Sequence, residues 1–489
     1  MALTLNDTSL LKDLAFINGE WVGAQSGATF SVKNPATGEV LAKVPDMTAQ
    51  ETERAIDAAH EAWADWRAMP AKQKASLLRR WYDLVMGAQE DLARLMTAEQ
   101  GKPLAESRAE VAYGASYIEW FAEEAKRIYG DTIPAATSDK RLVVIKQPVG
   151  VVGAITPWNF PNAMIARKIA PALAAGCPVV AKPAEDTPLS SLALAELAQR
   201  AGIPAGLINI VTSSRANAAA VGSALTGSDK VRKISFTGST AVGKILMRQA
   251  ADSVKKVSME LGGNAPFLVF DDADLDAAVD GVIASKYRNT GQTCVCANRI
   301  IVQTGIYEAF LQKLAKRVSG FTVGNGLEVE DAVQGPLINA AALDKVERHV
   351  KDAVDKGARV ILGGQRHSLG GTFYEPTILA DVTTEMCVTY EETFGPVAPI
   401  YRFESEEQAI ALANDTEFGL AAYFYSRDIG RVWRVAEALE VGIVGINEGI
   451  ISSELAPFGG IKQSGQGREG SKYGLDDYLE IKYLCMGGI

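Results

Sequence analysis

The stretch Val231-Arg-Lys-Ile-Ser-Phe-Thr-Gly-Ser-Thr-Ala-Val-Gly243 carries the features that decide the fold. Its run at 231–236 predicts a strand, the glycines that follow mark a turn, and the next residues predict the start of a helix. Gly238 and Gly243 would let the backbone approach a pyrophosphate, with the amides of the helix N-terminus facing it. Because the spacing departs from Gly-x-Gly-x-x-Gly, a tight turn without a ligand explains the glycines equally well.

The same order of strand, turn and helix recurs around this stretch. Short apolar runs lie at 150–155, 178–182 and 207–211, and each is followed by an Ala-rich helical segment. This alternation predicts a parallel sheet with helices on both faces. Ligands of such sheets bind at the carboxyl ends of the strands, so polar residues at those ends are the first candidates for a site.

A second α/β region follows, and a different pattern precedes the first. A strand is predicted at 267–270 and a helix at 274–288, with further strands at 358–362, 419–426 and 441–447. Short strands are expected within 15–46, and a helical layer over 48–127 whose buried stripe is formed by Leu77, Leu78, Trp81, Leu84 and Val85. The C-terminal segment 478–485 alternates like a strand that could pair with a partner subunit.

Composition restricts the class of protein. The 489 residues are 47% hydrophobic and 22% charged, which predicts a soluble protein of two or three domains. A net charge of −10 argues against a nucleic-acid partner, and it leaves the recognition of any anionic substrate to local arginines. The apolar stretch 163–181 contains Arg167-Lys168, so we expect no membrane span. The five cysteines form no disulfide framework and the N-terminus resembles no signal peptide, so we expect a cytoplasmic protein.

The three histidines, at 60, 349 and 367, are too few for several classes of site. A zinc site with several histidine ligands or a Cys–His hydrolase would need histidines in functional loops, whereas we expect all three at the surface. We therefore predict no metal. No Gly-x-Ser-x-Gly elbow stands at a strand end with a histidine partner.

Four short motifs could carry chemistry, and each has an ordinary structural explanation as well. In Met259-Glu-Leu-Gly-Gly-Asn264, burial of Glu260 would raise its pKa and suit it to general-base catalysis. In Gly291-Gln-Thr-Cys-Val-Cys296, Cys294 is either a reactive thiol or a small buried side chain. The prolines of Pro157-Trp-Asn-Phe-Pro161 could fix Asn159 as an oxyanion donor or simply stiffen a turn. Lys182-Pro-Ala-Glu185 fits either ribose recognition or a solvated turn.

Taken together and in this order, the motifs resemble the aldehyde dehydrogenase family over nearly the whole chain. The matching segments are Pro-Trp-Asn-Phe-Pro at 157–161, Lys-Pro-Ala-Glu at 182–185, Phe-Thr-Gly-Ser-Thr at 236–240, Met-Glu-Leu-Gly-Gly-Asn at 259–264, Gly-Gln-Thr-Cys at 291–294, Glu-Glu-Thr-Phe-Gly-Pro at 391–396 and Pro-Phe-Gly-Gly at 457–460. The resemblance implies a Rossmann-like parallel-sheet cofactor domain, a second α/β catalytic domain and a small β arm that joins subunits into a homodimer or homotetramer. The implied ranges are 1–126 with 147–258, then 259–469, and 127–146 with 470–489.

The resemblance also implies roles for individual residues. Cys294 would attack the aldehyde, Asn159 and the Cys294 amide would hold the oxyanion, and Glu260 would activate water. The implied contacts to a nicotinamide cofactor are Trp158, Lys182, Glu185, Gly238, Ser239, Gly243, Leu261, Glu392 and Phe394. A carboxylate at Glu185 would repel a 2′-phosphate, so NAD is expected over NADP.

Within the family the chain is most similar to succinate-semialdehyde dehydrogenases. The supporting runs are 285–296, 447–453 and 467–474. The resemblance implies that Arg167, Arg288 and a serine at 452 or 453 bind the substrate carboxylate, although both arginines could instead pair with surface acids. Glutarate or 2-oxoglutarate semialdehyde remains an alternative substrate. Glu260 would be unnecessary in a relative that transfers its acyl group to coenzyme A, and a non-catalytic protein on this fold would be expected to lack Cys294 or Glu260. Cys296 either packs or forms a reversible disulfide with Cys294.

Overall fold

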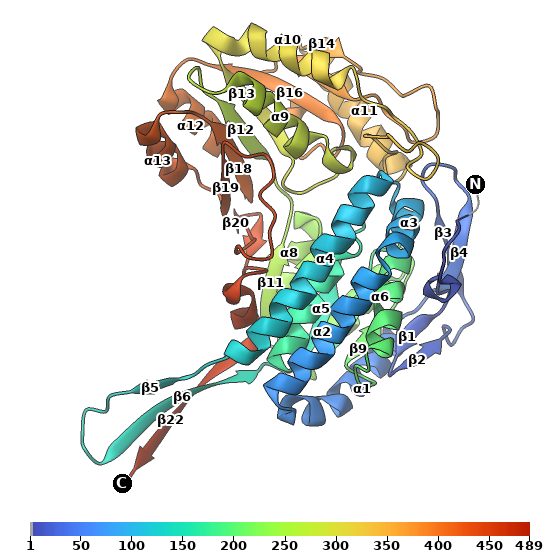
Figure 1. Cartoon of the computed structure of the whole chain (residues 1–489), viewed down its shortest axis with the longest axis vertical. Helices are drawn as coiled ribbons and strands as arrows, with labels where there is room; N and C mark the ends of the chain where they lie inside the picture. Colours follow the sequence, from blue (N-terminus) through green and yellow to red (C-terminus); the bar gives the residue numbers. More distant parts are fainter. Residues whose placement is uncertain (1–2) are drawn as a thin grey trace.

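The computed structural model describes residues 3–489, which form two α/β lobes and a projecting β arm (Figure 1). The first lobe contains an eight-stranded sheet in the order β2-β1-β9-β8-β7-β10-β11-β21. Its strands are β1 (Ala15–Ile17), β2 (Glu20–Val22), β7 (Val151–Ile155), β8 (Val179–Lys182), β9 (Ile208–Ile210), β10 (Val231–Thr237), β11 (Lys256–Glu260) and β21 (Gly465–Gln466). The strands β9, β8, β7, β10 and β11 are parallel, as predicted.

Helices cover this sheet and form the layer that the sequence predicted near the N-terminus. They are α1 (Ala49–Ala68), α2 (Ala71–Gly87), α3 (Gln89–Gln100), α4 (Leu104–Glu124), α5 (Ala163–Ala175), α6 (Leu189–Arg200), α7 (Ala218–Gly227) and α8 (Thr240–Ala251). The two-stranded sheet of β3 (Thr29–Lys33) and β4 (Val40–Pro45) lies beside them. Among the described residues no helix has the length and apolar character that crossing a membrane requires.

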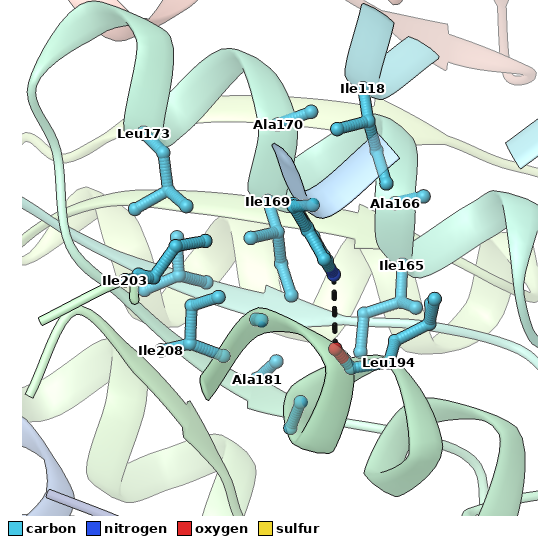
Figure 2. Close-up of a cluster of buried hydrophobic side chains, with 14 of the residues drawn as sticks. Ile118, Ile165, Ala166, Ile169, Ala170, Leu173, Ala181, Leu194, Ile203 and Ile208 are labelled. Atoms are coloured by element: carbon cyan, nitrogen blue, oxygen red, sulfur yellow. Dashed lines mark hydrogen bonds between the residues drawn. The ribbon is translucent and has the colours of Figure 1, made fainter. Parts of the chain in front are cut away.

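The core of this lobe lies between α5 and the sheet. Figure 2 shows Ile165 and Ile169 of α5 close to Leu194 of α6 and Ile208 of β9, all of them buried. The Trp81 indole, on the predicted stripe of α2, donates a hydrogen bond to the Leu194 carbonyl at 3.1 Å. Burial of such large side chains stabilises the lobe by roughly 1.5–3 kcal/mol each. This core holds α5 and the strand ends in a fixed relation.

The second lobe contains a seven-stranded sheet in the order β14-β15-β16-β13-β12-β18-β19. Its strands are β12 (Ala265–Val269), β13 (Ala297–Gln303), β14 (Arg359–Leu362), β15 (Thr377–Ala380), β16 (Val397–Phe403), β18 (Ala421–Tyr425) and β19 (Ile443–Ile446). Only the edge strand β14 is antiparallel to its neighbour within this sheet. The helices of the lobe are α9 (Leu275–Lys286), α10 (Tyr307–Val318), α11 (Ala340–Asp355), α12 (Glu406–Asn414) and α13 (Ile429–Ala438).

The arm is a three-stranded antiparallel sheet that leaves the first lobe (Figure 1). It consists of β5 (Asp131–Ile133), β6 (Lys140–Pro148) and β22 (Leu479–Gly487). β22 pairs with β6 from Leu479↔Pro148 to Gly487↔Lys140. Ile481 and Tyr483 are 73% and 57% exposed, which is unusual for apolar side chains on a paired strand and fits the predicted subunit contact.

Most predicted elements are confirmed within a few residues, and two expectations are wrong. β21 lies inside the range assigned to the catalytic domain, yet it pairs with β11 in the first sheet. His349 was expected at the surface, whereas its side chain on α11 is fully buried. The polar neighbours Arg348 and Lys351 suggested an exposed segment, but His349 lies on the buried face of this helix with Leu343, Val346 and Val350. The other domain boundaries stay predictions.

Candidate active site

One cavity of about 340 Å³ lies where the two lobes meet and brings distant motifs together. Its wall includes Asn159 from the loop after β7, Glu260 from the end of β11 and the Cys294 thiol. Ser239 and Glu392 line it as well. The three predicted catalytic residues therefore share one space, and several carboxyl ends of the first sheet contribute to it, as expected for an α/β fold.

Cys294 follows a loop with an uncommon backbone. Asn289 and Thr290 have φ values of 52° and 57°, which is rare for a β-branched residue such as Thr290. A Cβ on Gly291 would lie 2.1 Å from the Gly395 carbonyl oxygen, so only glycine fits there. The loop thus places a half-buried thiol in the cavity. Burial raises the pKa of Cys294 to about 12, with Arg167 acting in the opposite direction. The resting thiol is therefore protonated at neutral pH.

Asn159 is held from several sides. Its Nδ2 donates to the Gln292 carbonyl at 3.0 Å. The backbone carbonyl oxygen of Asn159 accepts from Lys102 Nζ at 2.7 Å and from Asn289 Nδ2 at 2.9 Å. The second N–H of Nδ2 remains available as a donor, and Asn159 lines the cavity. This geometry suits an oxyanion donor that does not have to reorganise.

Glu260 is a buried carboxyl group without a local partner. Neither carboxyl oxygen has a hydrogen bond within residues 3–489, and the side chain is 3% exposed. Burial, together with the nearby Glu469, raises the pKa of Glu260 well above its usual range. Burial favours the protonated form of this carboxyl group, whereas water or a cation that enters the cavity favours the carboxylate, which can then act as a base.

The structure adds a charged group behind Glu260 that the sequence reading missed. Glu469 is buried and pairs with both Arg167 and Lys168; the distance to Lys168 Nζ is 2.5 Å. Although burial favours the neutral form, the two cations lower the pKa of Glu469. The signal was present in the sequence, because two adjacent cations interrupt the apolar helix α5 and a buried cation needs an acid.

The cofactor end of the cavity contains most of the residues that the resemblance implied. The rings of Trp158 and Phe394 meet edge to face at 5.5 Å between centroids. Glu392 accepts a hydrogen bond from the Gly263 amide at 3.2 Å, and burial raises the pKa of Glu392 to about 7. Gly238, Ser239 and Leu261 also line the cavity. Ser239 caps the N-terminus of α8, which faces the space that a pyrophosphate would need.

Three implied cofactor residues lie outside the lining of this cavity. Lys182 donates to the Pro183 carbonyl at 3.1 Å and lies 3.6 Å from Glu185. Gly243 is one turn inside α8, where an added Cβ would lie 2.4 Å from Cδ2 of Leu261. The packing of α8 on β11 thus explains this glycine. Its contact with a pyrophosphate stays a prediction, as do the ribose contacts of the other two.

A second cavity of about 280 Å³ opens on the other side of the thiol. Its lining includes Cys294, Arg167, Arg288 and Ser452, which are the predicted nucleophile and the predicted substrate grip. Ser453 is absent from the lining and accepts a hydrogen bond from the Leu455 amide, so Ser452 is the better candidate of the two. A thiol at one end and two guanidinium groups along the wall suit a short aldehyde with an anionic tail.

The two arginines differ in how they are held. Arg167 is buried, pairs with Glu469 and has Nη2 without a hydrogen-bond partner in the described chain. Arg288 is half-buried, with its guanidinium 5.5 Å from the centroid of the Phe160 ring. Glu106, another lining residue, accepts from the Asn289 amide at 2.7 Å; burial raises the pKa of Glu106 to about 6. Both guanidinium groups thus retain donors for a ligand.

Cys296 points away from this chemistry. It is buried, lines neither cavity and lies 3.6 Å from the Lys286 carbonyl oxygen, to which its thiol donates. No disulfide is present among residues 3–489. A Cys294–Cys296 bond would therefore require the loop to rearrange, and the redox switch stays a hypothesis.

Comparison with known proteins agrees with this geometry. The family model described as "Aldehyde dehydrogenase family" matches residues 21–484. The chain is 64% identical over 487 residues to a 3-sulfolactaldehyde dehydrogenase of Pseudomonas putida, covering 100% of this chain and 99% of that protein. It is 62% identical over 485 residues to an NADP-dependent succinate-semialdehyde dehydrogenase of Escherichia coli, covering 99% and 100%.

Solved structures lead to the same family. A crystal structure described as an NADP-dependent enzyme of Escherichia coli superposes with a TM-score of 0.98 at 62% identity, covering 99% of this chain and 100% of the other. A succinate-semialdehyde dehydrogenase from Burkholderia pseudomallei gives the same values. With the family model matching nearly the whole chain and the catalytic motifs gathered around one thiol, this protein belongs to the aldehyde dehydrogenase family.

Proposed function

We propose that this aldehyde dehydrogenase oxidises succinate semialdehyde to succinate with NAD(P). The observation that carries the proposal is the cavity that joins Cys294 to Arg167, Arg288 and Ser452. A four-carbon substrate has its aldehyde and its carboxylate at opposite ends, and this cavity offers a nucleophile and cationic donors in the same arrangement.

The first step is addition to the aldehyde. The Cys294 thiol gives up its proton to solvent water in the cavity as its sulfur bonds to the aldehyde carbon. The aldehyde oxygen gains the negative charge. The Asn159 amide and the Cys294 backbone N–H stabilise that charge because both are fixed beside the sulfur.

The first cavity fits a nicotinamide cofactor. Thr237 Oγ1 is buried there without a partner in the part of the chain described, and the N-terminus of α8 opens into the same space. Trp158 and Phe394 would lie beside the nicotinamide ring, Glu392 would take the ribose hydroxyls, and Gly238 and Ser239 would hold the pyrophosphate. When bound, NAD(P)⁺ supplies the acceptor for the hydride that leaves the substrate carbon.

The last step releases the acid. Glu260 takes a proton from water, the hydroxyl oxygen bonds to the thioester carbon, the carbon–sulfur bond breaks, and Glu260 passes the proton to the leaving sulfur. Cys294 is regenerated and the substrate leaves as a carboxylate. The raised pKa of Glu260 and its isolation from hydrogen-bond donors support this role.

Substrate choice within the acid-bearing aldehydes is the finer part of the proposal. The relatives' names cover 3-sulfolactaldehyde, glutarate semialdehyde and succinate semialdehyde, so they share a short aldehyde with an acidic group. Glutarate semialdehyde, one carbon longer, is the second candidate. A panel of these aldehydes measured by kcat/KM decides between them, and a clear preference for another aldehyde would refute succinate semialdehyde.

Cofactor choice and assembly complete the proposal. Glu185 next to Lys182 favours NAD, although a 62% identical relative is named for NADP. Comparing kcat/KM for the two cofactors tests this, and a preference for NADP would overturn it. The exposed apolar residues of β22 support a homodimer or homotetramer, which light scattering would measure.

A further inference from the structure

A polar cluster outside both cavities contains the ligand types that zinc prefers. His349 of α11, Cys387 at the start of a short 3-10 helix (Cys387–Thr389) and Glu391 each offer one ligand atom, and these atoms all lie within 4.8 Å of one another. In a tetrahedral zinc site with bonds of about 2.0–2.3 Å, the ligand atoms are about 3.3–3.8 Å apart. Side-chain movements of about 1 Å would therefore bring the three ligand atoms to the spacing of a zinc site.

The histidine is already oriented as a metal ligand would be. His349 Nε2 faces Glu391 Oε2 at 3.1 Å, and Nδ1 lies 3.1 Å from Thr393 Oγ1. In protein zinc sites the ring nitrogen that does not bind the metal usually donates to a neighbouring oxygen, which fixes the tautomer and the ring. Thr393 can supply that oxygen, and a cation bound by Nε2 would take the place of Arg348 Nη2, which lies 3.4 Å from this nitrogen.

The environment allows access and exchange. His349 is buried, Cys387 is half-buried and the Glu391 side chain is 46% exposed, so the site opens to solvent on one side. Arg348 donates to both carboxylate oxygens of Glu391, at 2.6 and 3.2 Å. Since the Arg348 side chain is 53% exposed, it can move into water when a cation takes its place.

We propose that His349, Cys387 and Glu391 form a binding site for a divalent zinc-like cation that regulates the enzyme. Three protein ligands leave a fourth position for water, and the mixture of imidazole, thiolate and carboxylate is typical of zinc. The site differs from the active centre because none of its three ligands lines either cavity.

The position of the cluster connects it to the cofactor. Glu391 and Thr393, which both contact His349, are the two neighbours of Glu392 in the chain. Phe394, the next residue, has a φ of 57°, so this loop already has an unusual backbone. A cation that draws Glu391 away from Arg348 moves Glu392 and weakens cofactor binding. This consequence rests on the proposed role of Glu392, whereas zinc binding itself does not.

Zinc binding is tested in a Cys294→Ser background, so that the active-site thiol cannot take the metal. Competition with a chromophoric chelator should give one equivalent of zinc, and adding Cys387→Ser or His349→Gln should weaken its binding at least about tenfold. Cobalt should show a thiolate charge-transfer band in the near ultraviolet that Cys387→Ser abolishes. Cys485→Ser, which removes an exposed cysteine on the arm, is the matched control and should leave both signals intact.

The outcomes distinguish a failure of the proposed metal site from a failure of its proposed regulatory role. Absence of zinc binding, or binding that Cys387→Ser leaves unchanged, overturns the site. Circular dichroism shows whether each variant is folded. If His349→Gln does not fold, the conservative variant Cys387→Ser decides the test by itself. Fluorescence titration with NAD in the Cys294→Ser protein should give a higher Kd when zinc is present. An unchanged Kd with one zinc bound refutes the regulatory part alone.

Discussion

Arg288 offers the sharpest test of how this enzyme chooses its substrate. The guanidinium lines the substrate cavity, stands over the Phe160 ring and has no ion pair within residues 3–489. Arg288→Ala should therefore remove the proposed contact to the substrate's carboxylate without breaking an ion pair within residues 3–489. A charge-assisted hydrogen bond contributes about 1.5–3 kcal/mol, which corresponds to a loss of about 10- to 150-fold in kcat/KM for succinate semialdehyde.

The assay compares succinate semialdehyde with butanal, which has the same number of carbons and no charge. For butanal the loss should stay within about threefold, because Cys294, Asn159 and Glu260 are untouched. Arg288→Lys should recover part of the loss, since a point charge remains but the bidentate geometry does not. Arg434→Ala, at an exposed arginine paired with Glu406, is the control for the loss of a positive charge. Equal losses for the acidic and the neutral aldehyde would refute the role of Arg288.

Four further predictions address the catalytic residues, the loop and the packing. Glu260→Gln should slow acid release by about 100-fold or more while a burst of NADH equal to the enzyme concentration persists in stopped-flow measurements; loss of the burst contradicts a role limited to hydrolysis. Because the pKa of Cys294 is about 12 without ligands, inactivation of the free enzyme by iodoacetamide should accelerate about tenfold per pH unit from about pH 7 to 9, and a plateau in that range contradicts this value. Gly243→Ala should destabilise the protein by about 1–3 kcal/mol in thermal unfolding, since its Cβ would overlap Leu261, whereas Gly227→Ala, with open space around it, should not. If the disulfide switch operates, peroxide inactivation should be reversed by dithiothreitol in the natural protein and not in Cys296→Ala; equal recovery of both rejects it.

The sequence alone determined the fold class and the nature of the chemistry. Alternating strands and helices predict parallel sheets because each element has to bury one apolar face, and this requirement is visible residue by residue. The motifs around Asn159, Glu260 and Cys294 were recognisable because few residue types fit at their positions. At Gly291, for example, the neighbouring backbone leaves no room for a side chain. The resemblance then supplied their roles.

Only the tertiary structure decided which side chains share a space and how they are charged. Glu469 lies more than 300 positions from Arg167 along the chain, so no local pattern predicts their ion pair. Burial and the nearby Glu469 raise the pKa of Glu260, while Arg167 acts in the opposite direction. The same holds for His349, whose polar neighbours predicted exposure and whose side chain is buried against Thr393. The burial and the pKa of a side chain depend on contacts that form only on folding, whereas the order of strands, helices and motifs follows from local sequence patterns.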